Sequence, residues 1–157
     1  MRHTISVLVE NKFGVLARIA GLFSARGYNI ASLAVSETLD PGISYMTIVV
    51  DAKDITVLEQ IKKQLNKLID VLTVADFTKK EHVERELVLA KVSCGAKDKA
   101  RLEAVLSKFV AKLIQRKGDT AIIEAVAEEA QIRQLLEALR PFDIKELVRT
   151  GKIAVGI

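Results

Sequence analysis

The order in which hydrophobic periodicity changes along the chain constrains the fold more than any other feature. Alternating apolar residues, typical of strands, and apolar residues at helical spacing follow one another in the order βαββαβ between residues 4 and 77. The same order returns between residues 86 and 155. Each such unit predicts a four-stranded antiparallel sheet with both helices on one face. We therefore expect two units of one pattern in tandem.

The first unit has clear boundary signals. Asp54 is expected to cap the second helix, and Gly27 to end the first. Asp40-Pro41-Gly42 supplies the backbone angles that a tight turn needs. Strands are predicted at residues 4–10, 28–39, 43–51 and 71–77, and the first helix at 14–26.

The second unit repeats these elements and completes an α+β, ferredoxin-like prediction for both halves. Strands are predicted at 86–94, 111–116 and 120–127, an extended segment at 143–155, and helices at 97 to about 110 and 128–139. The charged segment 79–85 has little to bury and is interpreted as a linker. The predicted domains are therefore residues 1–78 and 86–157, joined by 79–85.

Burial and composition suggest how the chain associates. Met46 to Val50 is apolar at consecutive positions, so both faces of the first sheet should be buried, and a second copy would provide the cover. We expect at least a homodimer.

The sequence contains no long apolar run, begins directly with a strand and has one cysteine. These features predict a cytoplasmic protein without a membrane span.

The inventory of catalytic side chains is small. His3 lies near the start, His82 in the predicted linker, and Cys94 at a strand end without a CxxC partner. No spacing of His, Cys and carboxylates suggests a metal site, and no glycine-rich nucleotide motif is present. We interpret the chain as non-enzymatic, without a catalytic residue, metal or cofactor of its own.

A binding site for a small zwitterion is predicted around the start of the first helix. Gly14 leaves the unpaired N–H groups of the helix start open to a carboxylate. The amides of Asn11 and Asn29 can accept from an ammonium group or donate to a carboxylate. The alternative is that Asn11, Gly14 and Asn29 are ordinary loop and turn residues.

Several segments resemble one known family. The longest motif reads NKFGVLARI from Asn11 and continues GLFSARGYNIASL from Gly21. Shorter ones are SYMTIVV from Ser44, LIDVL from Leu68, HVEREL from His82 and RTGKIA from Arg149. Together they resemble the small regulatory subunit of acetohydroxyacid synthase, also called acetolactate synthase, with its N-terminal ACT domain. One departure is Tyr45, where the resemblance leads us to expect a basic residue.

The resemblance implies a specific role. Such a subunit activates a large catalytic subunit that uses thiamine diphosphate, magnesium and FAD, in branched-chain amino acid biosynthesis. It also transmits allosteric feedback inhibition by valine, or by leucine or isoleucine, bound between the ACT domains of two chains. Carried over to this sequence, the effector site comprises Asn11, Gly14, Val15, Leu16, Asn29 and Ile30, with Asn29 reaching from the second chain.

Two other functions are compatible with parts of the sequence. RNA-binding domains share the βαββαβ order, and the sequence pI is about 9.2, with the whole basic surplus in residues 79–157. Such domains stack bases on aromatic residues of the central strands, and only Tyr45 and Phe77 are offered here. We therefore expect no nucleic-acid partner. A free-standing ACT sensor for another enzyme or regulator is the closer alternative.

Overall fold

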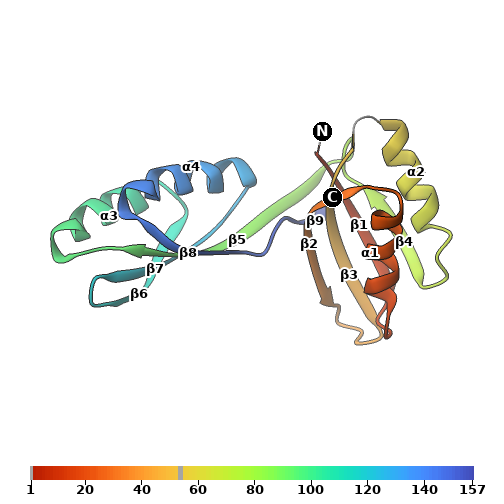
Figure 1. Ribbon diagram of the computed structural model, residues 1–157, viewed down its shortest axis with the longest axis horizontal. Helices are drawn as coiled ribbons and strands as arrows, with labels where there is room; N and C mark the ends of the chain where they lie inside the picture. The colour runs from red at the N-terminus through yellow and green to blue at the C-terminus, as the bar shows by residue number, and fades with distance from the viewer. Residues whose placement is uncertain (1, 53–54) are drawn as a thin grey trace. The chain divides into compact units, whose positions relative to one another are not determined.

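The computed structural model describes residues 2–52 and 55–157, and the chain divides into two compact units. Unit 1 comprises residues 1–83 together with 152–157, and unit 2 comprises residues 84–151. In each, two helices cover one face of an antiparallel sheet (Figure 1). The α+β prediction of two ferredoxin-like units is confirmed.

Unit 1 follows the predicted order of elements closely. The sheet order is β2-β3-β1-β4, so the first strand lies between the third and the fourth. Its elements are β1 (Arg2–Glu10), α1 (Val15–Ala25), β2 (Asn29–Glu37), β3 (Ile43–Asp51), α2 (Ile55–Leu65) and β4 (Val71–Asp76). The predicted cap residue Asp54 lies outside the described residues.

The unit 1 core forms where alternating strand positions meet the apolar faces of both helices. Ile5, Val7 and Val9 of β1 are completely buried. Phe23 of α1 and Leu58, Ile61 and Leu65 of α2 pack against the same cluster. Large aliphatic residues at these spacings hold both helices on one face of the sheet.

Two short connections in unit 1 have the chemistry that the sequence indicates. Gly27 adopts φ +68°, and the N–H groups of Gly27 and Tyr28 donate to the last carbonyls of α1. Because glycine has no Cβ, Gly27 adopts this left-handed conformation without steric cost, and α1 ends there. In the β2–β3 turn, the Asp40 carboxylate accepts from the Gly42 N–H at 2.8 Å.

The sheet face of unit 1 opposite the helices is partly covered by the end of the chain itself. Strand β9 (Ile153–Gly156) lies in unit 1. The Ala154 N–H donates to Thr47 Oγ1 at 3.3 Å, and the Tyr45 hydroxyl donates to the Ala154 carbonyl at 2.8 Å. Thr47 and Val49 are consequently buried. The predicted burial of this face is therefore partly met without a second copy.

Tyr45 thus anchors β9, and we expect Tyr45→Phe to lower the free energy of unfolding of unit 1 by about 1 kcal/mol, the usual value of one hydrogen bond. Urea unfolding followed by the fluorescence of the remaining tyrosine, Tyr28, measures the loss. Tyr28→Phe is the control, because the Tyr28 hydroxyl forms no hydrogen bond with the described residues. Equal effects of both changes would contradict the anchoring role.

Unit 2 repeats the topology of unit 1, with sheet order β6-β7-β5-β8. Its helices are shorter on average, and 3₁₀ turns precede α3 and follow α4. Its elements are β5 (His82–Ser93), α3 (Lys99–Leu106), β6 (Ala111–Lys117), β7 (Thr120–Ala127), α4 (Glu129–Leu139) and β8 (Ile144–Arg149).

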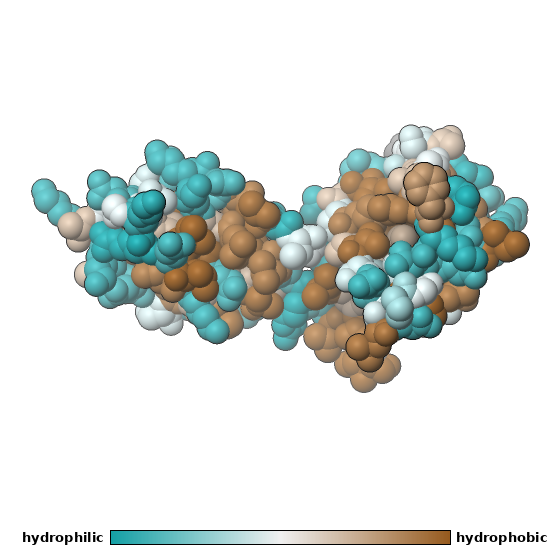
Figure 2. Space-filling view, turned by 90° about the horizontal axis from the view of Figure 1, so that it is seen from below, coloured by the Kyte–Doolittle hydropathy of each residue, from teal (hydrophilic) through white to brown (hydrophobic). Residues whose placement is uncertain are grey.

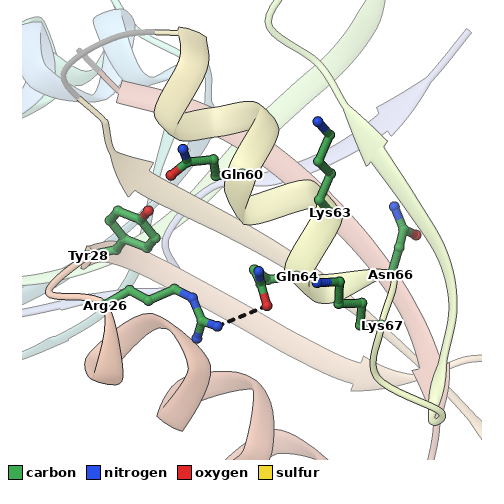
Figure 3. A pocket seen from close by; sticks show the side chains of 7 residues that line it. All are labelled: Arg26, Tyr28, Gln60, Lys63, Gln64, Asn66 and Lys67. Atoms are coloured by element: carbon green, nitrogen blue, oxygen red, sulfur yellow. Dashed lines mark hydrogen bonds between the residues drawn. The ribbon is translucent and has the colours of Figure 1, made fainter.

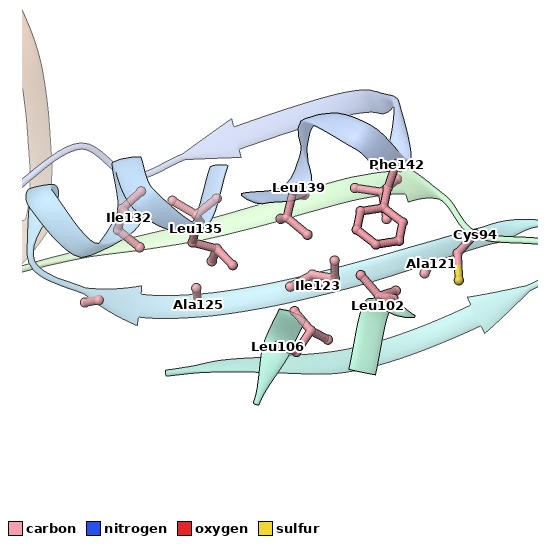
Figure 4. Close-up of a cluster of buried hydrophobic side chains, with 14 residues drawn as sticks. Cys94, Leu102, Leu106, Ala121, Ile123, Ala125, Ile132, Leu135, Leu139 and Phe142 are labelled. Carbon is pink, nitrogen blue, oxygen red and sulfur yellow. The ribbon is translucent and has the colours of Figure 1, made fainter. Parts of the chain in front are cut away.

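The unit 2 core is built on small residues in one strand and large residues on the helices. Ala121, Ile123 and Ala125 of β7 face Leu102 and Leu106 of α3 and the leucines of α4 (Figure 4). The small alanines leave room for the helices to approach the sheet. Cys94 is a buried member of this cluster.

The repetition extends to irregularities that periodicity does not reveal. The pairing of β2 with β3 shifts between Ile30 and Ser32, and that of β6 with β7 between Leu113 and Gln115. The pairing of β1 with β4 and that of β5 with β8 also shift at matching positions. Both units therefore carry the same pair of bulges, which bend and twist the sheet locally.

Three boundaries differ from the prediction. Residues 82–85, expected in the linker, begin strand β5, and the His82 ring stacks on Phe77 with centroids 5.0 Å apart. The helix expected from 97 to about 110 is divided into a 3₁₀ turn and the shorter α3. The extended segment 143–155 is interrupted at Gly151 (φ +76°), after which residues 152–157 pack in unit 1.

Candidate functional site

Gly14 forms an open helix start in unit 1. It precedes α1 with φ +82° and ψ −7°, and no side chain caps the helix there. Among the described residues, no backbone carbonyl accepts from the N–H groups of Leu16 or Ala17. Unpaired N–H groups at the positive end of a helix dipole favour an anion such as a carboxylate.

Asn11 lies beside this helix start and is fixed by two hydrogen bonds. Its backbone N–H donates to the Gly42 carbonyl at 2.7 Å, and its side-chain Nδ2 donates to the Pro41 carbonyl at 2.8 Å. These bonds tie the loop before α1 to the β2–β3 turn. Because Nδ2 is engaged, the side chain presents mainly its amide oxygen, which accepts from an ammonium group.

Asn29 is the first residue of β2 and lies at the other end of α1. Its Nδ2 donates to Asp51 Oδ2 at 3.0 Å, so its amide oxygen is also the group left for a ligand. The eleven residues of α1 extend for about 16 Å between Gly14 and the Gly27 turn. One amino acid cannot span that length, so Asn29 and Gly14 of the same chain do not form one site.

The three apolar residues predicted at the site take different orientations. Val15 is buried in the core and its N–H donates to the Lys12 carbonyl at 3.3 Å. Ile30 packs partly buried against the same core. Leu16 has an exposed side chain and an unpaired N–H. Leu16 is therefore the one of the three that offers both a donor and an apolar surface.

Arg18 and Asp70 support this loop and were not identified from the sequence. Arg18 Nη2 lies 2.6 Å from Asp70 Oδ2, and the Asp70 carbonyl accepts from the Glu10 N–H at 2.9 Å. Arg18 Nη1 lies 4.0 Å from the position that a Cβ on Gly14 would take. The pair connects the end of β1 to the helix start. The only local signal is the one-turn spacing of Gly14 and Arg18.

The nearby cation Lys12 is neutralised. It forms an ion pair with Glu10 at 2.6 Å, and the hydrogen bond to Glu10 raises the pKa of its ammonium group. The loops around Asn11 carry three large apolar side chains that are almost fully exposed: Phe13, Leu39 and Ile69. Figure 2 looks onto this end of unit 1, where hydrophobic residues gather at the surface. Charge at the site therefore comes mainly from the backbone.

Among the described residues, the histidines and the cysteine are not brought together. His3 contacts Thr78 Oγ1 through Nδ1 at 3.1 Å, His82 contacts the Lys80 carbonyl, and Cys94 lies in the unit 2 core. Within residues 2–52 and 55–157, no group of three or more metal-binding side chains occurs. In the same part of the chain, no helix has the length and apolar character needed to cross a bilayer.

Comparison with known families assigns both units. Residues 5–73 match the AHAS small subunit-like ACT domain, and residues 85–156 match the family described as the small subunit of acetolactate synthase. The first match contains Asn11, Gly14 and Asn29. The second contains all of the helices and strands of unit 2 after the first residues of β5.

Individual proteins match along nearly the whole chain. The probable acetolactate synthase small subunit of Archaeoglobus fulgidus is 45% identical over 155 residues, covering 99% of this chain and 96% of its own. The acetolactate synthase small subunit of Aquifex aeolicus is 48% identical, covering 98% and 80%.

A solved structure matches equally completely. The acetolactate synthase small subunit of Thermotoga maritima is 35% identical and superposes with a TM-score of 0.89, covering 100% of this chain and 98% of its own. Fold, length and sequence therefore agree in both units, and the chain belongs to the acetolactate synthase small-subunit family, with an N-terminal ACT domain.

Proposed function

We propose that this protein is the non-catalytic regulatory subunit of an acetolactate synthase and that its ACT domain binds a branched-chain amino acid. The observation that carries this proposal is the open start of α1 at Gly14, with Asn11 beside it. The relatives are small subunits of that enzyme, which supports a large catalytic subunit as the partner.

The site has a complementary group for each part of a branched-chain amino acid. The N–H groups of Leu16 and Ala17 suit its carboxylate. The amide oxygens of Asn11 and Asn29 suit its ammonium group. The exposed side chain of Leu16 suits a short aliphatic chain. Valine, leucine and isoleucine all satisfy these requirements, and valine is the effector we propose first.

The distance between Gly14 and Asn29 supports a site shared by two copies. Because α1 separates these residues within one chain, a ligand that contacts both must lie between the helix start of one protomer and the β2 start of another. A homodimer with twofold symmetry provides two such sites. The effector would then stabilise one relation between the two ACT domains.

Regulation would follow from that change in the dimer. If the large subunit prefers one arrangement of the ACT domains, an effector that prefers another changes the activity by linkage, with a typical coupling of about 1–3 kcal/mol. The thiamine diphosphate, magnesium and FAD expected for the reaction would be held by the large subunit.

The alternatives have less support. An RNA-binding sheet needs free aromatic faces on its central strands, but the Tyr45 hydroxyl is bonded to Ala154 and Phe77 stacks on His82. A free-standing ACT sensor does not account for unit 2, which matches the acetolactate synthase small-subunit family over residues 85–156.

A carboxylate placed at the helix start tests the site. Calorimetric titration with valine, leucine and isoleucine should give binding of at least one of them to the dimeric protein. Gly14→Asp should weaken that binding at least about tenfold, because the added charge repels the ligand carboxylate near the N–H groups. Asp is among the residues that tolerate a positive φ, so the fold should persist.

Gly118→Asp is the matched control. Gly118 also has a positive φ, of +58°, and lies in the β6–β7 turn of unit 2. Gly118→Asp introduces the same charge and a similar backbone strain at a residue that is not part of the proposed effector site, so binding should be unchanged. No heat with any of the three amino acids, or equal losses in both variants, would refute the proposed effector site.

A further inference from the structure

One pocket in unit 1, separate from the Gly14 helix start, is lined by an unusual set of residues. It has a volume of about 570 Å³ and lies between the end of α1 and the face of α2. Three of its residues are cations, three are amides and one is a tyrosine: Arg26, Lys63, Lys67, Gln60, Gln64, Asn66 and Tyr28. No carboxylate of the described residues lines it. The volume is within the range of about 300–1,000 Å³ that is typical of small-molecule sites.

The cations of this pocket differ from the other basic residues that the structure describes between residues 2 and 78. Arg2, Lys12, Arg18 and Lys62 each form an ion pair with an acidic side chain. Among the described residues, no acidic side chain pairs with Arg26, Lys63 or Lys67. Residues 1–78 hold equal numbers of basic and acidic residues. The positive charge at the pocket therefore arises because these three cations lie near one another, not because residues 1–78 carry a net positive charge.

The guanidinium of Arg26 is held in position on the pocket wall. It donates from Nη2 to Gln64 Oε1 at 2.9 Å and from Nη1 to the Leu22 carbonyl at 3.4 Å. Figure 3 shows Arg26 directed toward Gln64, with Tyr28 on one side and Lys67 and Asn66 on the other. A guanidinium has five N–H donors, so Arg26 retains donors for a ligand.

Helix stabilisation explains part of this arrangement. Cations near helix C-termini interact favourably with the helix dipole, by about 0.3–1 kcal/mol each, and Arg26 and Lys63 occupy such positions. That effect requires neither a shared cavity nor the absence of acidic partners. The three amides and the tyrosine hydroxyl that line the pocket add neutral donors of the kind that recognise oxyanions.

We propose that this pocket binds a small oxyanion with at least two negative charges, either a phosphate compound or a polycarboxylate. Arg26, Lys63 and Lys67 would neutralise its charge, and Gln60 and Asn66 would donate to its remaining oxygens. The pocket lies away from Asn11 and Gly14 and does not include either. None of the six proposed effector residues lines this pocket, and Tyr28 directly precedes Asn29, so the two ligands would occupy separate but neighbouring sites.

Calorimetry on the full chain tests the proposal with two probes at constant ionic strength: inorganic pyrophosphate and citrate. We expect at least one to bind, and the preferred probe identifies the phosphate or carboxylate class. Lys63→Gln and Lys67→Gln should each weaken binding about tenfold, since one charge-assisted hydrogen bond is lost. Lys63 lies in α2, where Gln is a good helix former, and Lys67 lies in the turn that follows. Both residues are exposed, so the variants should fold.

Lys79→Gln is the control, since it removes an equal charge from an exposed position of unit 1 outside this pocket. It should leave the affinity for the probes unchanged. Equal weakening by Lys79→Gln and by the pocket variants would reduce the effect to general charge attraction and overturn the proposal. Absence of binding by both probes would overturn it as well and would assign the three cations to helix stabilisation alone.

Discussion

A heterodimer of two defective variants, Asn11→Ala and Asn29→Ala, is expected to recover one effector site. Each change removes an amide oxygen that would accept from the ligand ammonium group, and a hydrogen bond to a charged group contributes about 1.5–3 kcal/mol. Each variant homodimer should therefore lose roughly 10- to 150-fold in affinity. In the heterodimer, Asn11 of one chain and Asn29 of the other remain intact at one of the two sites.

The reciprocal heterodimer makes the experiment decisive. Wild type paired with the double variant Asn11→Ala/Asn29→Ala has no intact site if each site uses both chains. It has one intact site if each site lies within a single chain. The two pairings thus give opposite results under the two arrangements.

Co-expression with two different affinity tags isolates each heterodimer, and calorimetry with valine gives the number of sites. We expect one high-affinity site per dimer for the first pairing and none for the second. The reverse result would place the whole site in one chain. It would also require a rearrangement of α1, because about 16 Å of helix separates Gly14 from Asn29 in one chain.

The elements of both units could be predicted because their signals are local. Alternation in Thr4–Glu10 and helical spacing in Leu58, Ile61 and Leu65 depend only on neighbours in the sequence. The return of β9 to unit 1 has no such signal. It depends on hydrogen bonds of Ala154 to Thr47 and Tyr45, more than a hundred residues earlier.

In the candidate site, too, the residues with local signals could be predicted from the sequence and the long-range contacts could not. Gly14 and Asn11 stand out because a glycine before a helix and an asparagine at a strand end have local roles. Arg18 and Asp70 are 52 residues apart, and nothing near either one indicates the pair. The orientation of Ile30 toward the core depends on the bulge after it, which a strict strand alternation does not reveal.

Two segments that carry the family resemblance meet in unit 2. Glu86, in the segment beginning at His82, is bonded by Arg149 of the last motif: Arg149 Nε and Nη2 donate to the two Glu86 oxygens at 2.6 and 2.7 Å. The hydrogen bonds to Glu86 raise the pKa of Arg149. The Thr150 N–H donates to the Leu87 carbonyl beside them. This paired contact fixes the end of β8 against β5.

Loss of this ion pair is expected to destabilise unit 2 more than loss of an exposed ion pair in the same unit. The Glu86 side chain is 4% exposed and that of Arg149 is 43% exposed. Arg149→Met leaves a buried carboxylate without its partner, which costs about 3–5 kcal/mol when both groups are buried. Because water reaches the Arg149 side, we expect a loss of about 2–3 kcal/mol.

The distribution of tyrosines allows this loss to be assigned to unit 2. Tyr28 and Tyr45 are the only tyrosines, both lie in unit 1, and the chain has no tryptophan. Tyrosine fluorescence therefore follows unit 1, whereas far-UV circular dichroism follows both. In urea, Arg149→Met should lower the midpoint of the circular dichroism transition more than that of the fluorescence transition.

Two further variants separate the buried charge from other effects of the substitution. Arg140→Met breaks an exposed pair with Glu137 and should cost at most about 0.5 kcal/mol. Glu86→Met/Arg149→Met removes both charges, so it should be more stable than Arg149→Met alone, because no unpaired carboxylate remains buried. If the double variant were less stable than Arg149→Met, lost packing of the arginine side chain, not the uncompensated Glu86 charge, would be the source of the instability.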